Sequence, residues 1–158
     1  MKHLLIILIS ILLLSSPVIG DNHKGETLYG WITSSSTLEW KTFGEKGTHP
    51  IYKGDVENGK PNGLGVITFL DGSKFVGEYK DGEKNGQGIF TFSWGQKYVG
   101  EWMNGEKNGR GTTTWTDGYQ YVGYFKDDEP WNGTYYNNNG KKEYKLVNGK
   151  IEYINNTP

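Results

Sequence analysis

Apolar and polar residues alternate along most of the chain from Leu28 onward, which is the pattern of β-strands that bury one face. In the stretch 98–102, for example, Tyr98 and Trp102 fall on one face and Glu101 falls on the other. Asn-Gly and Asp-Gly pairs separate many of these stretches, and both pairs favour tight turns. No segment after residue 20 has helical periodicity, so the pattern predicts an all-β protein.

The pattern recurs with a period of 23 residues. An aromatic residue followed two positions later by glycine starts each copy, at Tyr52, Phe75, Tyr98 and Tyr121. An Asn-Gly-x-Gly motif follows in three copies, at 62–65, 85–88 and 108–111. A fixed period of this length predicts a repeat architecture in place of one globular core.

Each copy is interpreted as one hairpin. In the third copy we expect strands at 98–102 and 111–115, with a turn region at 104–109. Aromatic rows are expected to fill the core, and glycines to make room for the rings or to form turns. The residues assigned these structural roles are Tyr52, Gly54, Gly63, Gly65, Phe75, Gly77, Tyr79, Gly86, Gly88, Tyr98, Gly100, Trp102, Gly109, Gly111, Tyr121 and Gly123.

The remaining chain is divided around these copies. Residues 21–51 are expected to form an atypical capping hairpin, with strands at 28–33 and 37–43 joined by Ser34-Ser35-Ser36. Copies one to three are 52–74, 75–97 and 98–120. Residues 121–140 form a degenerate fourth copy, with one extra residue before Asn132-Gly133, and 141–158 supply the last strands and a tail.

The first 20 residues have the layout of a secretory signal peptide: a basic start at Lys2, an apolar run over 4–14 and small or apolar residues up to Gly20. The run is short for a membrane span, which needs about 20 apolar residues. We therefore expect a secreted, periplasmic or envelope-associated protein. An uncleaved membrane anchor is the alternative interpretation.

The periodic motif resembles the MORN repeat (membrane occupation and recognition nexus) over about residues 52–133. The third copy carries the resemblance at Tyr98, Gly100, Trp102, Gly105, Gly109, Gly111, Asp117 and Gly118. The chain departs from the family pattern at Val56, where an aromatic is usual, and at Asn62, Asn85 and Asn108, where histidine is most frequent. The resemblance implies a single-layer antiparallel β-meander, twisted into a groove, that serves as a scaffold or interaction module. Some members of the family are credited with binding acidic phospholipids.

Composition excludes several classes of function. Without the leader, which carries Lys2 and no acidic residue, 16 basic and 18 acidic side chains remain, so nucleic acid is not an expected partner. The chain has no cysteine, and after the leader its histidines are His23 and His49, which is too few for a metal site. The Gly-x-Gly motifs lead into strands, so no dinucleotide cofactor is expected.

An enzyme of the cell envelope is the least favoured alternative. The repeated acids Asp55, Glu78 and Glu101 would need an apolar pocket for general acid–base catalysis. A single-layer sheet offers no deep pocket, so they are interpreted as a solvated charged face. We therefore expect a protein without catalytic residues.

The candidate binding residues are two tryptophans and four lysines. Trp94 stands at a turn where other copies have aspartate, and Trp131 lies in the expected loop of the fourth copy. An exposed tryptophan is a candidate contact for a partner. The lysines stack from copy to copy into two ladders at opposite hairpin ends, Lys74 with Lys97 and Lys84 with Lys107. Glu83 and Glu106 lie beside the second ladder and partly cancel its charge, so a balanced surface charge is the favoured interpretation of the lysines. A protein partner is the main expectation, and an acidic membrane lipid is the alternative.

Overall fold

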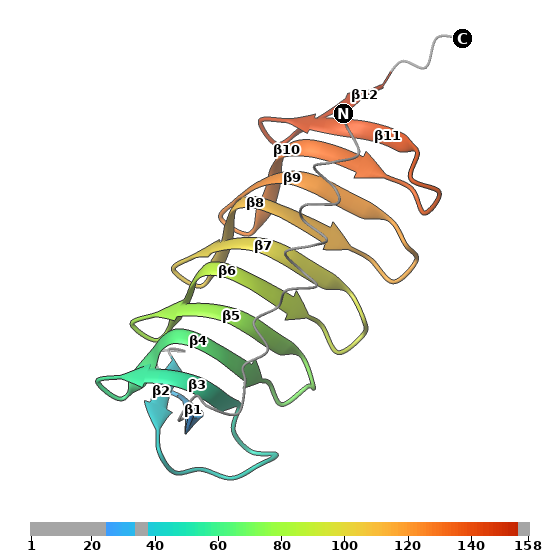
Figure 1. The fold of residues 1–158 in the computed structure, drawn as a ribbon. Helices are drawn as coiled ribbons and strands as arrows, with labels where there is room; N and C mark the ends of the chain where they lie inside the picture. Colours follow the sequence, from blue (N-terminus) through green and yellow to red (C-terminus); the bar gives the residue numbers. More distant parts are fainter. Residues whose placement is uncertain (1–24, 34–37, 155–158) are drawn as a thin grey trace.

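The computed structural model describes residues 25–33 and 38–154, and over these ranges it is built of strands and turns without helix (Figure 1). The strands are β1 Glu26–Ile32, β2 Leu38–Lys41, β3 Ile51–Glu57, β4 Lys60–Thr68, β5 Lys74–Lys80, β6 Glu83–Thr91, β7 Lys97–Met103, β8 Glu106–Thr114, β9 Gln120–Lys126, β10 Glu129–Tyr136, β11 Lys142–Val147 and β12 Lys150–Tyr153. The expected leader, His23, the turn at 34–36 and the tail at 155–158 lie outside the described residues. Helices that could cross a membrane are absent from the described ranges.

The described strands form one open antiparallel sheet of 12 strands, which confirms the all-β meander. From β3 to β12 every strand pairs with the next strand in the sequence, one hairpin per copy. The N-terminal hairpin departs from this order, because β1 lies between β2 and β3. Leu28 of β1 pairs with Tyr52 of β3, so β1 extends the first edge of the array.

Strand β2 is last in the strand order, yet it does not simply extend the sheet outward. The ring of Trp40 lies 5.7 Å from the ring of Tyr52 in β3, which is two strands away. The Trp40 indole also lies beside Gly82, in the turn between β5 and β6. The sheet is therefore curled at this end, and β2 lies over the aromatic face of the first copies.

The turns between the paired strands of each copy are two residues long. Asn104 and Gly105 both have positive φ, 52° and 85°, as a type I′ turn requires. The expected turn region of 104–109 is thus too long, and Asn108-Gly109 lies inside β8. Asn62-Gly63 and Asn85-Gly86 likewise lie inside β4 and β6. A two-residue type I′ loop forms in place of the longer expected turn, because the twist of this loop matches the twist of the flanking strands.

Each of the first three copies contains a bulge close to its Asn-Gly pair. In the third copy Gly100 pairs with Gly111 and Trp102 pairs with Lys107, so one residue of β7 faces three of β8. Gly109, one of those three, has φ +98°, and the carboxylate of Glu101 fills the space that a Cβ there would take. The positive φ expected at these glycines therefore serves a strand bulge and not a turn.

The repeated acids, which the sequence predicts to form a solvated charged face, also bond the backbone; Glu78 is exposed, and Asp55 is half-buried. The amide of Leu64 donates a hydrogen bond of 2.9 Å to Asp55 Oδ2, and the amide of Gln87 donates one of 3.1 Å to Glu78 Oε1. These carboxylates satisfy backbone groups that the bulge leaves without a strand partner. The sequence interpretation did not include these backbone hydrogen bonds, because the bulge cannot be recognised from alternation alone.

The bulges bend the strands toward the aromatic face. Lys84 and Phe90 are six residues apart in β6, yet the Lys84 ammonium lies 5.5 Å from the centroid of the Phe90 ring. Six residues of straight strand would span about 20 Å. The strands of the array are therefore curved into a long trough (Figure 1). The aromatic residues of the core lie on its inner face.

A row of paired glycines crosses the sheet beneath these rings. Gly100 lies between Gly88 and Gly111 on the neighbouring strands, and the other copies repeat this pairing. A Cβ at Gly111 would lie 2.5 Å from the Tyr98 ring. The rings therefore lie flat on the glycine backbone of the paired strand, as expected from the sequence.

The fourth copy differs from its sequence interpretation. Gly133 pairs with Gly123 as Gly111 pairs with Gly100, so Gly133 is the counterpart of Gly111. Between its two paired glycines the fourth copy therefore has one residue fewer than the third copy, whereas the sequence predicts one extra residue before Asn132-Gly133. The register of β10 shifts between Pro130 and Asn132, which makes Trp131 the bulge residue of this strand.

The core is a continuous row of aromatic rings along the trough. Tyr52, Phe75, Tyr98 and Tyr121 are at most 1% exposed, and rings from Tyr79, Trp102 and Phe125 stand between them. Most neighbours in this row meet edge to face, as Tyr98 meets Trp102 at 5.2 Å and Phe125 at 4.9 Å. Each such pair contributes about 0.5–1.5 kcal/mol beyond its buried area. Aromatic rings thus replace the aliphatic core that the chain lacks.

Candidate functional site

The inner face is hollowed at two adjoining places, which together we call the trough site. The larger hollow has a volume of about 360 Å³ and is lined by Lys84, Phe90, Phe92, Tyr98, Trp102, Lys107 and Asp128. The smaller one, about 230 Å³, lies between Leu38 and Trp40 of β2 and residues of the repeats, Tyr79 and Lys84 among them. Lys84 lines both hollows, so the two hollows adjoin at this residue.

A stack of rings leads from the floor of the trough to its rim. The centroid of the Phe92 ring lies 4.6 Å from that of Phe90 on one side and 4.6 Å from that of Trp94 on the other. Trp94 is 60% exposed, and its indole N–H donates to Gln96 Oε1 at 3.3 Å. Trp94 is therefore exposed, as the sequence predicts, and its ring also contacts the rings that form the floor of the site.

Lys84 and Lys107 turn inward over the rings. The Lys84 ammonium lies 4.0 Å from the centroid of a Trp102 ring, and the Lys107 ammonium lies 5.6 Å from the centroid of Phe125. Cation–π attraction of this kind is stronger where the cation is partly desolvated. The two residues do form the expected ladder, but it lines the trough and does not project from a hairpin end.

The lysine pair is confined to the two central copies. Lys84 pairs with Tyr79 and Lys107 pairs with Trp102, and prolines occupy the same register position in the flanking copies. These prolines are Pro61, opposite Val56, and Pro130, opposite Phe125. The trough site therefore presents two cations and no more along this row.

Burial lowers the pKa of Lys84 to about 8, and the neighbouring charge of Lys107 acts in the same direction. The carboxylate of Asp128 opposes this shift. Within the part of the chain that the structure describes, the ion pair is Lys41–Glu39, and neither trough lysine lies within 4.0 Å of a carboxylate oxygen. A desolvated cation without a direct ion pair is unfavourable, and the more distant carboxylate of Asp128 compensates the charge of Lys84 only in part.

Lys74 and Lys97 lie elsewhere. Both are exposed at the first positions of β5 and β7, and both pair with Thr91 of β6. Strand alternation places them on the outer face, opposite the aromatic rings. The four candidate lysines are thus divided between the two faces of the sheet and do not form one basic surface.

Trp131 is not in an exposed loop. It lies in β10, is half-buried, and its ring sits over Gly149 in the turn between β11 and β12. The ammonium of Lys126 lies 4.9 Å from its centroid. Its position indicates that it packs the last hairpin against the fourth copy, away from the trough site.

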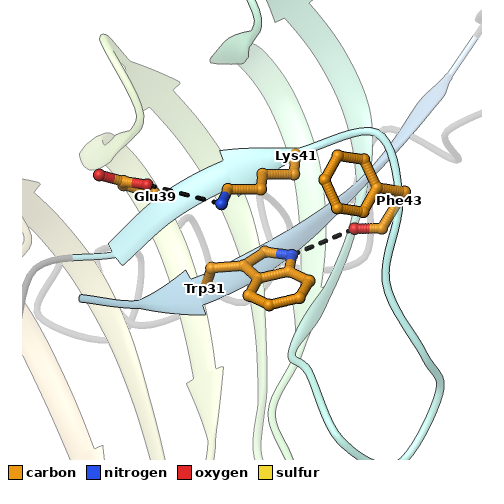
Figure 2. Close-up of polar contacts among 4 residues, drawn as sticks. All are labelled: Trp31, Glu39, Lys41 and Phe43. Atoms are coloured by element: carbon orange, nitrogen blue, oxygen red, sulfur yellow. Dashed lines mark hydrogen bonds and ion pairs between the residues drawn. The ribbon is translucent and has the colours of Figure 1, made fainter.

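A second aromatic cluster, which the sequence did not predict, lies on the N-terminal hairpin (Figure 2). The Trp31 indole N–H donates to the carbonyl oxygen of Phe43 at 3.1 Å, and Lys41 lies 4.7 Å from the Trp31 ring while pairing with Glu39 at 3.9 Å. The ring of His49 stacks at 4.0 Å on Trp31. Its polar groups have partners inside the cluster, which fastens the loop 42–50 to β1.

The trough site suits a ligand that combines apolar rings or extended apolar chains with negative charge. Sequence reasoning identified Trp94, Lys84 and Lys107 but missed Phe90 and Phe92 as floor residues. Their alternation with Trp94 at two-residue steps was the available signal. Among the described residues no group of three or more histidine, cysteine, aspartate or glutamate side chains could hold a metal ion.

Comparison with known families gives one result. The family model described as MORN repeat matches three consecutive segments, residues 52–74, 75–97 and 98–118. No curated protein matches the chain. The matched segments contain β3 from Tyr52 onward and all of β4 to β8, and therefore both trough lysines.

Proposed function

We propose that this chain is an exported, non-catalytic protein-binding or scaffolding module. Residues 52–118 match the MORN repeat model three times, and MORN repeats are generally modules that bind proteins or membranes. The trough site binds an acidic segment of a partner protein. The observation that carries this proposal is Lys84: its ammonium lies 4.0 Å over Trp102, in a hollow whose lining carboxylate, Asp128, is too distant to form an ion pair with it. A partner's carboxylate would supply a directly paired counter-ion.

The aromatic floor supports the same ligand. Tryptophan and other aromatic residues dominate the binding energy of protein interfaces, especially in partly enclosed pockets. Phe90, Phe92 and Trp94 offer adjoining ring faces next to the two ammonium groups. A peptide segment that combines apolar and acidic side chains would bury both kinds of group at once.

The test of binding compares an inner lysine with an outer one. Acidic, neutral and basic peptides of equal length are titrated while tryptophan fluorescence is recorded. Lys84→Met should weaken binding of the acidic peptides about tenfold, the effect of losing one interfacial charge pair of about 1.4 kcal/mol. Lys97→Met on the outer face is the matched control and should change nothing. Equal effects of the two substitutions would contradict the assignment of the site.

Export is the second part of the proposal, and the composition of residues 1–20 supports it. Expressed with its leader, the chain should accumulate outside the cytoplasm with a new N-terminus near Asp21, which N-terminal sequencing checks. Cytoplasmic protein with Met1 intact would refute export. Membrane-bound and uncut protein would establish the anchor in its place.

Peripheral binding to acidic membrane is the alternative function, favoured by the exposure of Lys74 and Lys97 on the outer face. A lysine near an anionic surface contributes about 1 kcal/mol, so two of them bind weakly. Sedimentation with phosphatidylserine vesicles, compared with phosphatidylcholine vesicles, tests it. Loss of sedimentation in the Lys74→Gln, Lys97→Gln double variant would support binding of the outer face to acidic membrane.

A further inference from the structure

We propose that the trough site recognises a polyproline II segment whose carboxylates are three residues apart, an inference that rests on the proposed function. It specifies both the conformation of the ligand and the spacing of its acidic residues. Three features of the inner face lead to it: the spacing of the two lysines, the aromatic floor and the boundaries of the trough.

The spacing of the lysines follows from the repeat. Lys84 and Lys107 occupy the same register position in consecutive copies, which are two strands apart in the sheet. Neighbouring strands lie about 4.8 Å apart, so equivalent atoms of consecutive copies are separated by about 9.6 Å. A polyproline II helix has three residues per turn and rises about 3.1 Å per residue, or about 9.3 Å per turn. Acidic residues one turn apart therefore match the two ammonium groups.

Other extended conformations fit less well. In a β-strand, residues on one face are about 6.7 Å or about 13 Å apart, and neither spacing matches. A β-strand ligand would also need a free sheet edge for main-chain hydrogen bonds, and the strands that form the floor, β6 and β7, are paired on both sides. An α-helix places residues seven apart on one face at about 10.5 Å, which makes it the closest competitor.

The floor has the chemistry that binds polyproline II. Pro-rich segments dock in grooves lined by aromatic side chains, since their rings pack on aromatic faces and their backbone needs no partner. In the trough Phe90 and Phe92 form the floor beside Trp102, and Trp94 continues it to the rim. The segment is stiff before it binds, so little conformational entropy is lost on binding.

The ends of the trough limit the ligand to two carboxylates. Leu38 and Trp40 of β2 stand at one end, and Asp128 lines the hollow of the two lysines, where its Oδ1 accepts a 2.8 Å hydrogen bond from the Lys107 amide. A third carboxylate beyond Lys107 would meet the negative charge of Asp128. From β4 to β8 the trough extends about 19 Å, which is about six residues of polyproline II.

The experiment uses capped hexapeptides of identical composition and net charge. Pro-Glu-Pro-Pro-Glu-Pro has its glutamates three residues apart, while Pro-Pro-Glu-Pro-Glu-Pro and Glu-Pro-Pro-Pro-Glu-Pro have them two and four apart. Calorimetric titration of the exported chain should give an affinity about fivefold or more higher for the first peptide. Lys84→Met should lower that affinity to the level of the other two, and Lys97→Met should leave it unchanged. Circular dichroism and urea midpoints confirm that both variants are folded.

The outcomes separate this inference from the proposed function. If the three isomers bind equally and all depend on Lys84, the proposed function stands and the spacing rule is refuted. Tighter binding of a helical peptide with glutamates seven apart would also refute the polyproline II conformation. If no acidic peptide binds at millimolar concentration, both proposals fail.

Discussion

Trp94 and Trp102 have opposite environments, since 60% of Trp94 and 5% of Trp102 are exposed. Trp102→Ala should cost about 3–5 kcal/mol of unfolding free energy, because it removes a ring that touches Phe75, Phe90 and Tyr98. Trp94→Ala should stay within about 0.5 kcal/mol and should weaken peptide binding. Urea denaturation and fluorescence titration measure the two effects. Equal destabilisation by both substitutions would place Trp94 in the core.

The hydroxyl groups of the tyrosine row are not equivalent. Tyr98 donates to the carbonyl oxygen of Glu101 at 2.9 Å, whereas the hydroxyl of Tyr79 is buried without a hydrogen-bond partner. Tyr98→Phe should therefore cost about 1 kcal/mol, and Tyr79→Phe should leave stability unchanged or raise it by up to about 1 kcal/mol. Phe75 already occupies a position in this row without a hydroxyl. Thermal and urea unfolding test the pair, and a loss above about 1 kcal/mol for Tyr79→Phe would contradict the assignment.

Lys84 should make stability depend on pH. Its pKa in the folded protein, about 8, lies below the ordinary value of 10.5, so the unfolded chain binds more protons between these values. The free energy of unfolding therefore rises with pH from about 8 toward 10.5. Lys84→Met should remove this rise and should stabilise the protein at pH 7 by about 1 kcal/mol, since no desolvated cation remains.

Urea midpoints at pH 7, 8 and 9 give the measurement for Lys84, with Lys97→Met as the control. The comparison stops below pH 10, because burial raises the pKa of Tyr121 to about 12 and ionisation of tyrosine in the unfolded chain then lowers stability. The same pH series should show weaker binding of acidic peptides as Lys84 loses its proton. A pH dependence that Lys84→Met leaves unchanged would show that another group causes it.

At the scale of the element, the bend of each hairpin depends on glycines that serve different purposes. A Cβ at Gly100 would lie 2.5 Å from the carbonyl oxygen of Arg110, whereas a Cβ at Gly105 would meet nothing within 4 Å. Gly105 instead has φ +85°, the left-handed region. Gly100→Ala should therefore cost about 3 kcal/mol through overpacking, and Gly105→Ala about 1–2 kcal/mol through backbone strain.

Chemical denaturation ranks these two glycine substitutions. Aromatic circular dichroism gives a second measurement. Gly100→Ala should change this signal, because the Tyr98 hydroxyl lies next to the position of the added Cβ. Gly105→Ala should leave that signal intact. The reverse ranking would mean that the glycine row is less closely packed than its contacts indicate.

At the scale of the whole molecule, stability should grow with the number of copies. Each hairpin contacts its sequence neighbours, so a repeat protein of this kind is nearly one-dimensional. Insertion of a second copy of 75–97 after residue 97 should give a folded chain with a higher urea midpoint. Its m-value should rise by roughly a sixth, in proportion to the added residues. A lower midpoint would show that the ends of the array, and not its copies, determine stability.

The inserted copy also adds a third trough lysine at the same spacing. A peptide with three glutamates, each three residues apart, should then bind more tightly than one with two. The curl of β2 over the first copies should stay in place in this variant, because Tyr52 and Gly82, which lie beside the Trp40 ring, both precede the insertion. Loss of binding by both peptides would indicate that the insertion shifts the register of the array.

The local features of this protein were predictable from its sequence. The 23-residue period, the absence of helix in the described residues and one hairpin per copy follow from alternation and from glycine and asparagine turns. The aromatic row at Tyr52, Phe75, Tyr98 and Tyr121 follows from the same period. These features depend on residues close together in the chain, where a period of two and a turn residue have a direct geometric meaning.

Cross-strand register decided the remainder. The turn at Asn104-Gly105 pairs Trp102 with Lys107 and leaves three residues of β8 opposite one of β7. The resulting bend directs Lys84 and Lys107 into the trough, places Asp55 and Glu78 on backbone amides, and hollows one face of the sheet. The curl that brings Trp40 over Tyr52 accumulates over several strands. No short segment determines these arrangements, because each is a sum of small displacements across paired strands that are distant in the sequence.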